Sequence, residues 1–165
     1  MKRVLAAVLV MGGILVAAAP DASAMRAGVG ANYWVAVEDI DDQDFDENGL
    51  SWMASIQFLP APLIKIEADI ELLPEGFLGS TDQVWAPQAY LLVGSFIYAG
   101  AGIGMYYTDG DFADDPFYAL RAGFDFPVGP VHLDINANYR FEGKLDADNI
   151  DTDTIFLGAA VRFGF

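Results

Sequence analysis

The sequence predicts an all-β fold: an eight-stranded antiparallel up-and-down transmembrane barrel that follows a cleaved signal peptide. Three observations support this prediction. The N-terminus has the pattern of a secretion signal, polar and apolar residues alternate in segments of about ten residues, and the connections between these segments alternate between long and short. A chain with these features is expected to cross a membrane with strands.

The first 24 residues, 1–24, are predicted to form the signal peptide. Two basic residues are followed by an apolar run at 4–19, and Ala22-Ser23-Ala24 has the small-x-small pattern of a cleavage site. The alternative is a membrane anchor, but the run is shorter than the roughly 20 residues that a spanning helix needs. We therefore predict cleavage before Met25 and a barrel domain at 25–165.

Eight strands are predicted in the mature chain. They are 26–37, 50–59, 64–73, 84–93, 96–107, 117–126, 131–142 and 154–165. The long, acidic connections are 38–49, 74–83, 108–116 and 143–153, and the short ones are 60–63, 94–95 and 127–130. Outer-membrane barrels have short turns on the periplasmic side and longer loops outside the cell, so this sorting favours a membrane barrel over a soluble sandwich.

The stretch "LIKIEADIEL" (63–72) shows which side of the wall is apolar. Lys65, Glu67, Asp69 and Glu71 alternate with isoleucine, alanine and leucine. Cations facing lipid near the midplane would each cost about 2–4 kcal/mol, and several of them would exceed a typical stability of about 5–15 kcal/mol. The polar faces are therefore predicted to line the lumen, and the apolar faces to contact lipid.

Together, the polar faces predict a network of charged groups in the lumen. Its predicted members are Lys65, Glu67, Asp69, Glu71, Arg121, Asp125, His132, Asp134, Arg140, Glu142 and Arg162. Because carboxylates outnumber lysine and arginine in this set, we expect the surplus carboxyl groups to hold a proton or reach water. Eight strands enclose a space that side chains can fill, so a continuous water pore is not expected.

Local features suggest how the strands pair. A tight hairpin at 127–130 would place Asp125 opposite His132 and Arg121 opposite Asn136, and the last hairpin would place Asp134 opposite Arg162. Inward glycines are expected to leave room for arginine side chains: Gly28, Gly30, Gly100, Gly102 and Gly104.

Pro87 cannot donate a ladder hydrogen bond, which leaves the facing of its strand ambiguous. We expect Trp85 and Leu91 to point outward and Gln88 and Tyr90 to point inward.

Aromatic residues are expected at both ends of the strands, as in the two interfacial girdles of a membrane barrel. Phe58, Phe126 and Phe165 lie at short-turn ends. Trp52, Trp85, Tyr107, Tyr118 and Tyr139 lie near long-loop ends.

Three stretches carry a resemblance to a known family: "YAGAGIGMYY" at 98–107, "ALRAGFDFPVGPVHLDINANYRF" at 119–141 and the closing "GAAVRFGF". With the signal peptide, they make the chain similar to the small bacterial outer-membrane β-barrel proteins of the OmpA/OmpX-like superfamily. The resemblance implies a place in the bacterial outer membrane and assembly by the barrel-assembly machinery through a last strand ending in Phe165. Because the chain stops at Phe165, we expect no cell-wall-binding domain.

Charge narrows the choice of partners. The precursor has 24 acidic and 8 basic residues, a formal net charge of −16, which argues against nucleic acid as a partner. Asp44, Asp46 and Asn48 match the first half of a calcium-binding loop, but Ser55 stands where the bidentate glutamate is required. We predict no metal site and no cofactor, although weak divalent cations bridging acidic loops to lipopolysaccharide are a hypothesis.

The leading functional hypothesis is a monomeric outer-membrane barrel with a structural or surface-interaction role. A channel or carrier for small hydrophobic molecules is the alternative, and Trp34, Met53 and Tyr106 could form its apolar lumen at the loop end. A lipid-modifying enzyme is less favoured, because no evident serine or cysteine nucleophile accompanies Asp125 and His132. A secreted lipocalin-type protein is also less favoured, because its apolar faces would point inward.

Overall fold

The computed structural model describes residues 25–36, 48–77, 79–142 and 153–165. Its strands are β1 (Met25–Ala36), β2 (Asn48–Ala61), β3 (Ile64–Leu73), β4 (Val84–Gly94), β5 (Ile97–Gly104), β6 (Tyr107–Thr108), β7 (Asp111–Phe112), β8 (Phe117–Val128), β9 (Val131–Glu142) and β10 (Thr154–Gly164). The predicted signal peptide and calcium-loop residues Asp44 and Asp46 lie outside the described residues.

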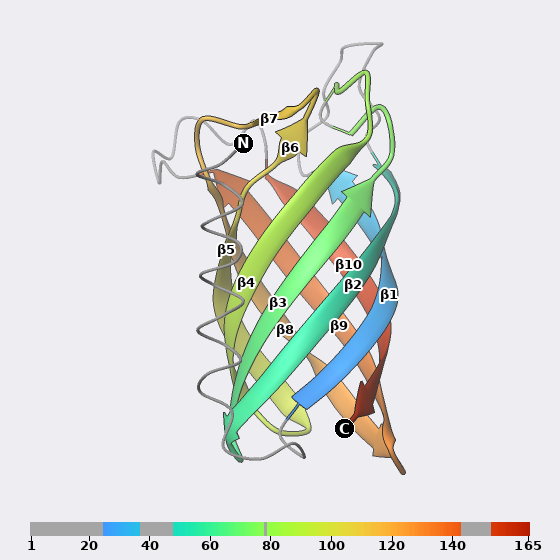
Figure 1. Cartoon of the computed structure of the whole chain (residues 1–165), viewed down its shortest axis with the longest axis vertical. Coiled ribbons are helices and arrows are strands. Elements are labelled where there is room, and N and C mark those ends of the chain that lie inside the picture. The colour runs from blue at the N-terminus through green and yellow to red at the C-terminus, as the bar shows by residue number, and fades with distance from the viewer. Residues whose placement is uncertain (1–24, 37–47, 78, 143–152) are drawn as a thin grey trace.

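The strands close into an antiparallel barrel, so the predicted fold class is confirmed (Figure 1). The order around the wall is β3-β2-β1-β10-β9-β8-β5-β4, and pairing of β3 with β4 closes the cylinder. Strand β6 extends the line of β5 and pairs with β4 through Trp85 and Tyr107. Strands β6 and β7 form a small hairpin, which joins the end of the predicted strand 96–107 to part of the connection 108–116 that was expected to be a loop. In the described part of the chain, no helix has the length and apolar character needed to span a membrane.

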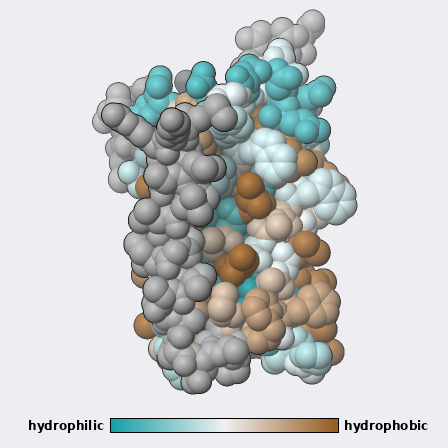
Figure 2. All heavy atoms as spheres, viewed as in Figure 1, coloured by the Kyte–Doolittle hydropathy of each residue, from teal (hydrophilic) through white to brown (hydrophobic). Residues whose placement is uncertain are grey.

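Burial alternates along the strands in the predicted sense. In β3, Lys65, Glu67, Asp69 and Glu71 are all buried, whereas Ile70 is 44% exposed on the outer surface. The other strands show the same alternation, with side chains such as Leu91 and Ile135 exposed. Figure 2 shows hydrophobic residues over the side wall and hydrophilic residues gathered at the loop end. The apolar wall therefore faces outward.

Aromatic side chains lie at both ends of this wall. Trp52, Trp85 and Tyr118 are exposed near the loop end, and Phe126 and Phe165 are exposed near the short turns. Phe58 differs from the expectation. It is only 3% exposed, and a register shift follows it between Phe58 and Ala61.

Two predicted hairpin registers were wrong by two residues. The β8–β9 turn is tighter than expected, with Gly129 at a φ of 66°, so Asp125 pairs with Asp134 and Arg121 with Asn138. In the last hairpin, Asp134 pairs with Ala160 instead of Arg162. A shift of two residues keeps every side chain on its predicted face, because successive side chains of a strand point to opposite faces of the sheet.

Strand β4 keeps one register through Pro87. Trp85 and Leu91 point outward and Gln88 and Tyr90 are buried, as expected. The ladder with β5 stops at the pair Gln88 and Gly104 and resumes in the same register at Trp85. Pro87 still accepts a hydrogen bond from the amide of Met105, at 3.1 Å. The proline therefore interrupts the ladder without shifting it.

Candidate functional site

The lumen at the short-turn end is organised around one carboxylate. Asp125 Oδ2 accepts hydrogen bonds from Lys65 Nζ at 2.6 Å and from Arg26 Nη1 at 2.8 Å. Its other oxygen, Oδ1, lies 2.7 Å from His132 Nδ1. The expected contact between Asp125 and His132 therefore forms, but diagonally, because the residue directly opposite His132 on β8 is Pro127.

The middle of the lumen contains two arginines that link three carboxylates. Arg121 donates to Glu67 Oε1 and to Asp69 Oδ2, both at 2.9 Å. Arg162 donates to the same Glu67 oxygen at 2.7 Å, and its Nη1 lies 3.0 Å from Asp134 Oδ2. All five side chains are almost fully shielded from solvent. Charge-assisted hydrogen bonds therefore connect β3, β8, β9 and β10 across the lumen.

Neutral side chains add hydrogen bonds to two of these carboxylates, Glu67 and Asp134, whereas Asp69 Oδ1 has no partner among the described residues. Gln57 donates to Glu67 at 2.7 Å, and Tyr98 and Asn136 donate to Asp134 at 2.7 and 2.6 Å. Such bonds matter because a buried ion pair needs its remaining lone pairs satisfied to offset desolvation.

Glu71 forms the third layer, nearer the long loops. The Glu71 carboxylate accepts hydrogen bonds from Arg140 and Ser51, and its Oε1 accepts another from Asn32 Nδ2 at 2.6 Å. The Arg140 guanidinium carbon lies 3.8 Å from the centre of the Phe156 ring and 5.0 Å from that of Phe117. Arg140 therefore joins the charged shaft to an aromatic region above it.

The sequence-based account of this network missed Arg26. It occupies the same face of β1 as Gly28, which could have revealed its inward direction. With Arg26, five bases (Arg26, Lys65, Arg121, Arg140, Arg162) accompany five acids (Glu67, Asp69, Glu71, Asp125, Asp134) among the described lumenal side chains. Nothing is described of the Glu142 side chain. Arg26 therefore reduces the expected excess of carboxylates, and the part of that prediction that concerns Glu142 lies outside the described side chains.

The inward glycines make room mainly for other groups. A Cβ on Gly28 would lie 2.5 Å from Cγ of Arg162, as expected for a glycine beside an arginine. At Gly102 and Gly104, the crowding side chains are the rings of Tyr90 and Phe117.

An apolar cluster, here called the aromatic cap, lies inside the barrel at the long-loop end. It consists of Trp34, Leu73, Phe77, Val84, Ala86, Phe117 and Phe156, with Tyr106 packed against it. Trp34 and Tyr106 are the residues expected to make this region apolar, whereas Met53 is buried outside the cap. Charges and an apolar chamber thus coexist in one lumen at different heights.

Phe77 is a member of the aromatic cap that the sequence analysis missed. It belongs to the connection between β3 and β4, which was expected to be an acidic loop, yet it is only 1% exposed. Its ring centre lies 4.9 Å from that of Trp34, 5.5 Å from Tyr106 and 6.2 Å from Phe156. A lone phenylalanine between two glycine-containing turns is a weak sequence signal for this inward packing.

Acidic side chains are exposed over the described part of the loop surface. Glu75, Asp82, Asp109, Asp111, Asp114 and Asp115 are exposed there. A hydrogen bond with Asp82, together with repulsion from its charge, raises the pKa of Asp109 above the usual aspartate value. Among the described residues, no group of three histidine, cysteine or acidic side chains could hold a metal ion. Asn48, the described member of the predicted half-motif, is exposed.

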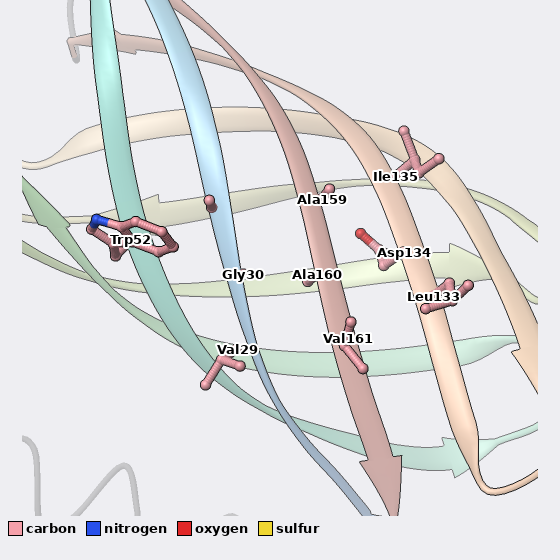
Figure 3. A pocket seen from close by; sticks show the side chains of 10 residues that line it. Val29, Gly30, Trp52, Leu133, Asp134, Ile135, Ala159, Ala160 and Val161 are labelled. Atoms are coloured by element: carbon pink, nitrogen blue, oxygen red, sulfur yellow. The ribbon is translucent and has the colours of Figure 1, made fainter.

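A shallow hollow marks the outer wall across β2, β1, β10 and β9 (Figure 3). Val29, Trp52 and Ile135 stand around the small residues Gly30 and Ala159. Because the hollow lies on the apolar outer surface, it forms part of the lipid-contacting wall rather than a separate binding pocket.

Comparison with known proteins supports the fold alone. No protein-family model matches the chain, and no curated protein matches its sequence. Neisserial surface protein A is structurally similar, with a TM-score of 0.63 and 20% identity over 87% of this chain and 98% of that one. The N-terminal β-barrel domain of Pseudomonas aeruginosa OprF has a TM-score of 0.52 and 9% identity, covering 87% and 98%. OprG from Pseudomonas aeruginosa has a TM-score of 0.51 and 12% identity, covering 87% and 97%.

The class of protein follows from the closed barrel, its apolar outer wall and these similarities. The chain has the fold of the small eight-stranded bacterial outer-membrane barrels. Its outer wall is the surface that such a barrel places in the outer membrane.

Proposed function

We propose that this protein is a sealed, monomeric outer-membrane barrel that acts through its outer face, in a structural or surface-interaction role. The observation that carries the proposal is the filled lumen. Side chains from β1, β3, β8, β9 and β10 meet in ion pairs along the shaft, and the aromatic cap fills the loop end. An eight-stranded barrel has room for this filling but none for a wide water channel beside it.

The acidic loops supply the proposed interaction surface. The described bases lie within the lumen, whereas the described loop acids are exposed. Such a surface attracts divalent cations and basic partners. Divalent cations bound there would bridge the loops to the phosphates of neighbouring lipopolysaccharide. On the periplasmic side, the exposed Phe163 and Phe165 of the last strand support recognition by the barrel-assembly machinery.

A non-catalytic role is part of this proposal. The pairing of His132 with Asp125 resembles half of a catalytic arrangement, but the same carboxylate also binds Arg26 and Lys65. A carboxylate held by two fixed cations is suited to an ion-pair cluster rather than to orienting a histidine as a general base.

The alternative role as a carrier of small hydrophobic molecules is favoured by one observation, the apolar chamber at the loop end. The charged layers of Glu71 and Arg140, and of Glu67 and Arg121, lie along the same lumen. They oppose passage of an apolar molecule through the shaft, so this alternative is restricted to binding at the outer end.

Planar-bilayer recording tests the sealed lumen. The mature protein should show no steady conductance, because moving ions would have to displace buried ion pairs. A stable ohmic conductance in every insertion would contradict the proposal. The surface role is tested with proteoliposomes and lipopolysaccharide vesicles. Calcium should promote binding and EDTA should reverse it, whereas Asn replacements at Asp111, Asp114 and Asp115 should weaken it. Binding that is independent of both calcium and these replacements would remove the bridging role.

A further inference from the structure

We propose that an aromatic patch on the outer wall at the loop end, formed by Tyr118, Tyr139 and Phe141, docks an arginine of an amphipathic peptide that lies along the membrane surface. The guanidinium stacks on the rings, and a neighbouring apolar side chain of the peptide fills a hollow in the wall beneath them. This inference deepens the surface-interaction role proposed above, on which it rests, because it names a class of partner and places the contact on the side of β8 and β9.

The rings of the aromatic patch lie in a near-parallel row. Tyr118 of β8 is paired with Phe141 of β9, and their ring centres are 6.0 Å apart with an interplanar angle of 28°. Tyr139 continues the row from the same face of β9, with its ring centre 5.8 Å from that of Phe141 and an angle of 30°. Tyr118, at one end of the row, is 39% exposed. Such a row can be extended by one more flat group, and a guanidinium is a flat cation that stacks on aromatic faces.

Carboxylates border the aromatic patch on its loop side. Asp153, the residue before β10, accepts a hydrogen bond from the Tyr139 hydroxyl group. Asp114 and Asp115 are exposed in the connection that leads into Tyr118. Every lysine and arginine that the structure describes lies in the lumen, so no described basic side chain accompanies these acids on the outside. A cation supplied by a partner is therefore attracted to this edge of the barrel.

The wall beneath the aromatic patch is hollowed. Ala99, Ala122 and Ala137 lie side by side on β5, β8 and β9, because Ala122 is paired with each of the other two. These small side chains are exposed on the outer wall, and a shallow hollow over them is also lined by Leu120, Tyr139 and Ile155. Tyr139 belongs to both the hollow and the aromatic patch, so the two adjoin. The order of apolar hollow, aromatic rings and carboxylates matches an amphipathic helix that buries its apolar face and keeps its basic residues at the membrane surface.

The chemistry of the aromatic patch favours arginine over lysine. A guanidinium is planar, is weakly hydrated and can bond a carboxylate through two parallel N–H groups. The ammonium group of lysine is a compact and strongly hydrated charge, which gains less from stacking on a ring. A glutamate in the same place would be repelled by Asp115 and Asp153, so an acidic peptide is excluded.

The test measures binding of three fluorescent peptides to the full mature chain in phosphatidylcholine nanodiscs by anisotropy. The peptides share one amphipathic leucine pattern and carry arginine, lysine or glutamate on the polar face. Empty nanodiscs correct for binding to lipid. The arginine peptide should bind about threefold more tightly than the lysine peptide, because only the guanidinium stacks on the rings. The glutamate peptide should show no saturable binding.

Replacing rings of the aromatic patch by leucine should weaken binding of the arginine peptide. Tyr118→Leu combined with Phe141→Leu should weaken it about tenfold, because cation–π contacts with two rings are lost. Tyr118→Phe keeps the ring and should leave the affinity unchanged. Trp52→Leu, which removes an exposed aromatic side chain from β2, is the matched control and should also leave it unchanged. A heat-shift gel establishes that each variant is folded. If the double variant does not fold, Phe141→Leu alone should weaken binding about threefold.

An equal loss of affinity in Trp52→Leu and in the leucine variants, or an unchanged affinity in the leucine variants, would overturn the docking site. Tighter binding of the lysine peptide than of the arginine peptide would do the same. Calcium-dependent binding of lipopolysaccharide vesicles, measured on the same preparations, separates this inference from the bridging role. If vesicle binding persists and the arginine peptide does not bind, the docking site alone is rejected. If vesicle binding fails and peptide binding still depends on the rings, the bridging role alone is rejected.

Discussion

The side chain of Arg162 in β10 passes directly over Gly28, its partner in the neighbouring strand β1. The two residues are paired in register, and a Cβ on Gly28 would lie 2.5 Å from Cγ of Arg162 and 2.5 Å from the backbone oxygen of Val161. The arginine then reaches Glu67 at 2.7 Å on the far side of the lumen. The glycine therefore provides the space through which a long cation enters the network.

Gly28→Val should destabilise the barrel because both the backbone and the Arg162 side chain would have to shift. Overpacking of this kind costs about 1–3 kcal/mol. Urea unfolding in lipid vesicles measures the free energy of unfolding. Gly164→Ala is the matched control, since a Cβ there lies 4.0 Å from its nearest neighbouring atom, the backbone oxygen of Met25. Equal stability of the two variants would remove the steric explanation.

Removing the cation of the Arg140 and Glu71 pair should be more damaging than removing both charges. Arg140→Met leaves Glu71 buried without its cation, and breaking a buried pair from one side costs about 3–5 kcal/mol. Glu71→Gln combined with Arg140→Met should recover part of this loss. A double-mutant cycle on unfolding free energies gives the coupling. Additive effects would show that the pair does not act as a unit.

Asp125→Asn should destabilise the barrel because it leaves Arg26 and Lys65 facing each other without their shared carboxylate. The loss is expected to be about 3–5 kcal/mol. Asp115→Asn, at an exposed loop position, is the control and should change stability by no more than about 0.5 kcal/mol. The same unfolding assay applies to both. A similar small effect at the two positions would show that the Asp125 cluster is hydrated rather than structurally coupled.

Which side chains of a strand point into the lumen could be predicted from the sequence, because this depends only on the alternation of polar and apolar residues. The residue that lies opposite each position on the neighbouring strand could not be predicted, because it depends on the geometry of the turn. Moving Asp125 from opposite His132 to opposite Asp134 changes the register by two residues and leaves both side chains in the lumen. Arginine and lysine side chains are long enough to reach across strands, so Arg162 and Asp134 still meet at 3.0 Å although they are not paired.

The aromatic cap was only partly predictable for a different reason. Trp34 and Phe156 occupy inward strand positions that alternation defines, but Phe77 enters from a connection that has no strand periodicity. Arg26 lies at the start of β1, and only the alternation of the residues that follow it, beginning with Gly28, indicates its inward direction. Loop packing and strand ends are the places where sequence patterns carry least information.

The contact between the β3–β4 connection and the β6–β7 hairpin should depend on pH. Asp109 has a raised pKa because it hydrogen-bonds Asp82 and is repelled by its charge. A raised carboxyl pKa means that the folded contact binds the proton more tightly. The contact is therefore favoured below the ordinary aspartate pKa and weakens as pH rises through the raised value.

NMR titration of the Asp109 carboxyl and of the neighbouring Thr108 amide measures this dependence. Ser80 and Thr108 lie 3.4 Å apart between the same two segments, so Thr108 should report loosening of the contact. Asp82→Asn should lower the Asp109 pKa toward its ordinary value, while Asp115→Asn should leave it unchanged. An identical Asp109 titration in the parent and in Asp82→Asn would contradict the assigned cause.

The three native tryptophans test the central claim, the direction of the wall, most directly. Trp52 is 62% exposed and Trp85 42% exposed on the outer surface, whereas Trp34 is 1% exposed within the aromatic cap. Variants retaining one tryptophan each should be reconstituted in vesicles whose acyl chains carry bromine, which quenches tryptophan fluorescence on contact. The fluorescence of Trp52 and Trp85 should be quenched strongly and that of Trp34 spared. Strong quenching of Trp34, with Trp52 and Trp85 unaffected, would show that the apolar wall does not face lipid.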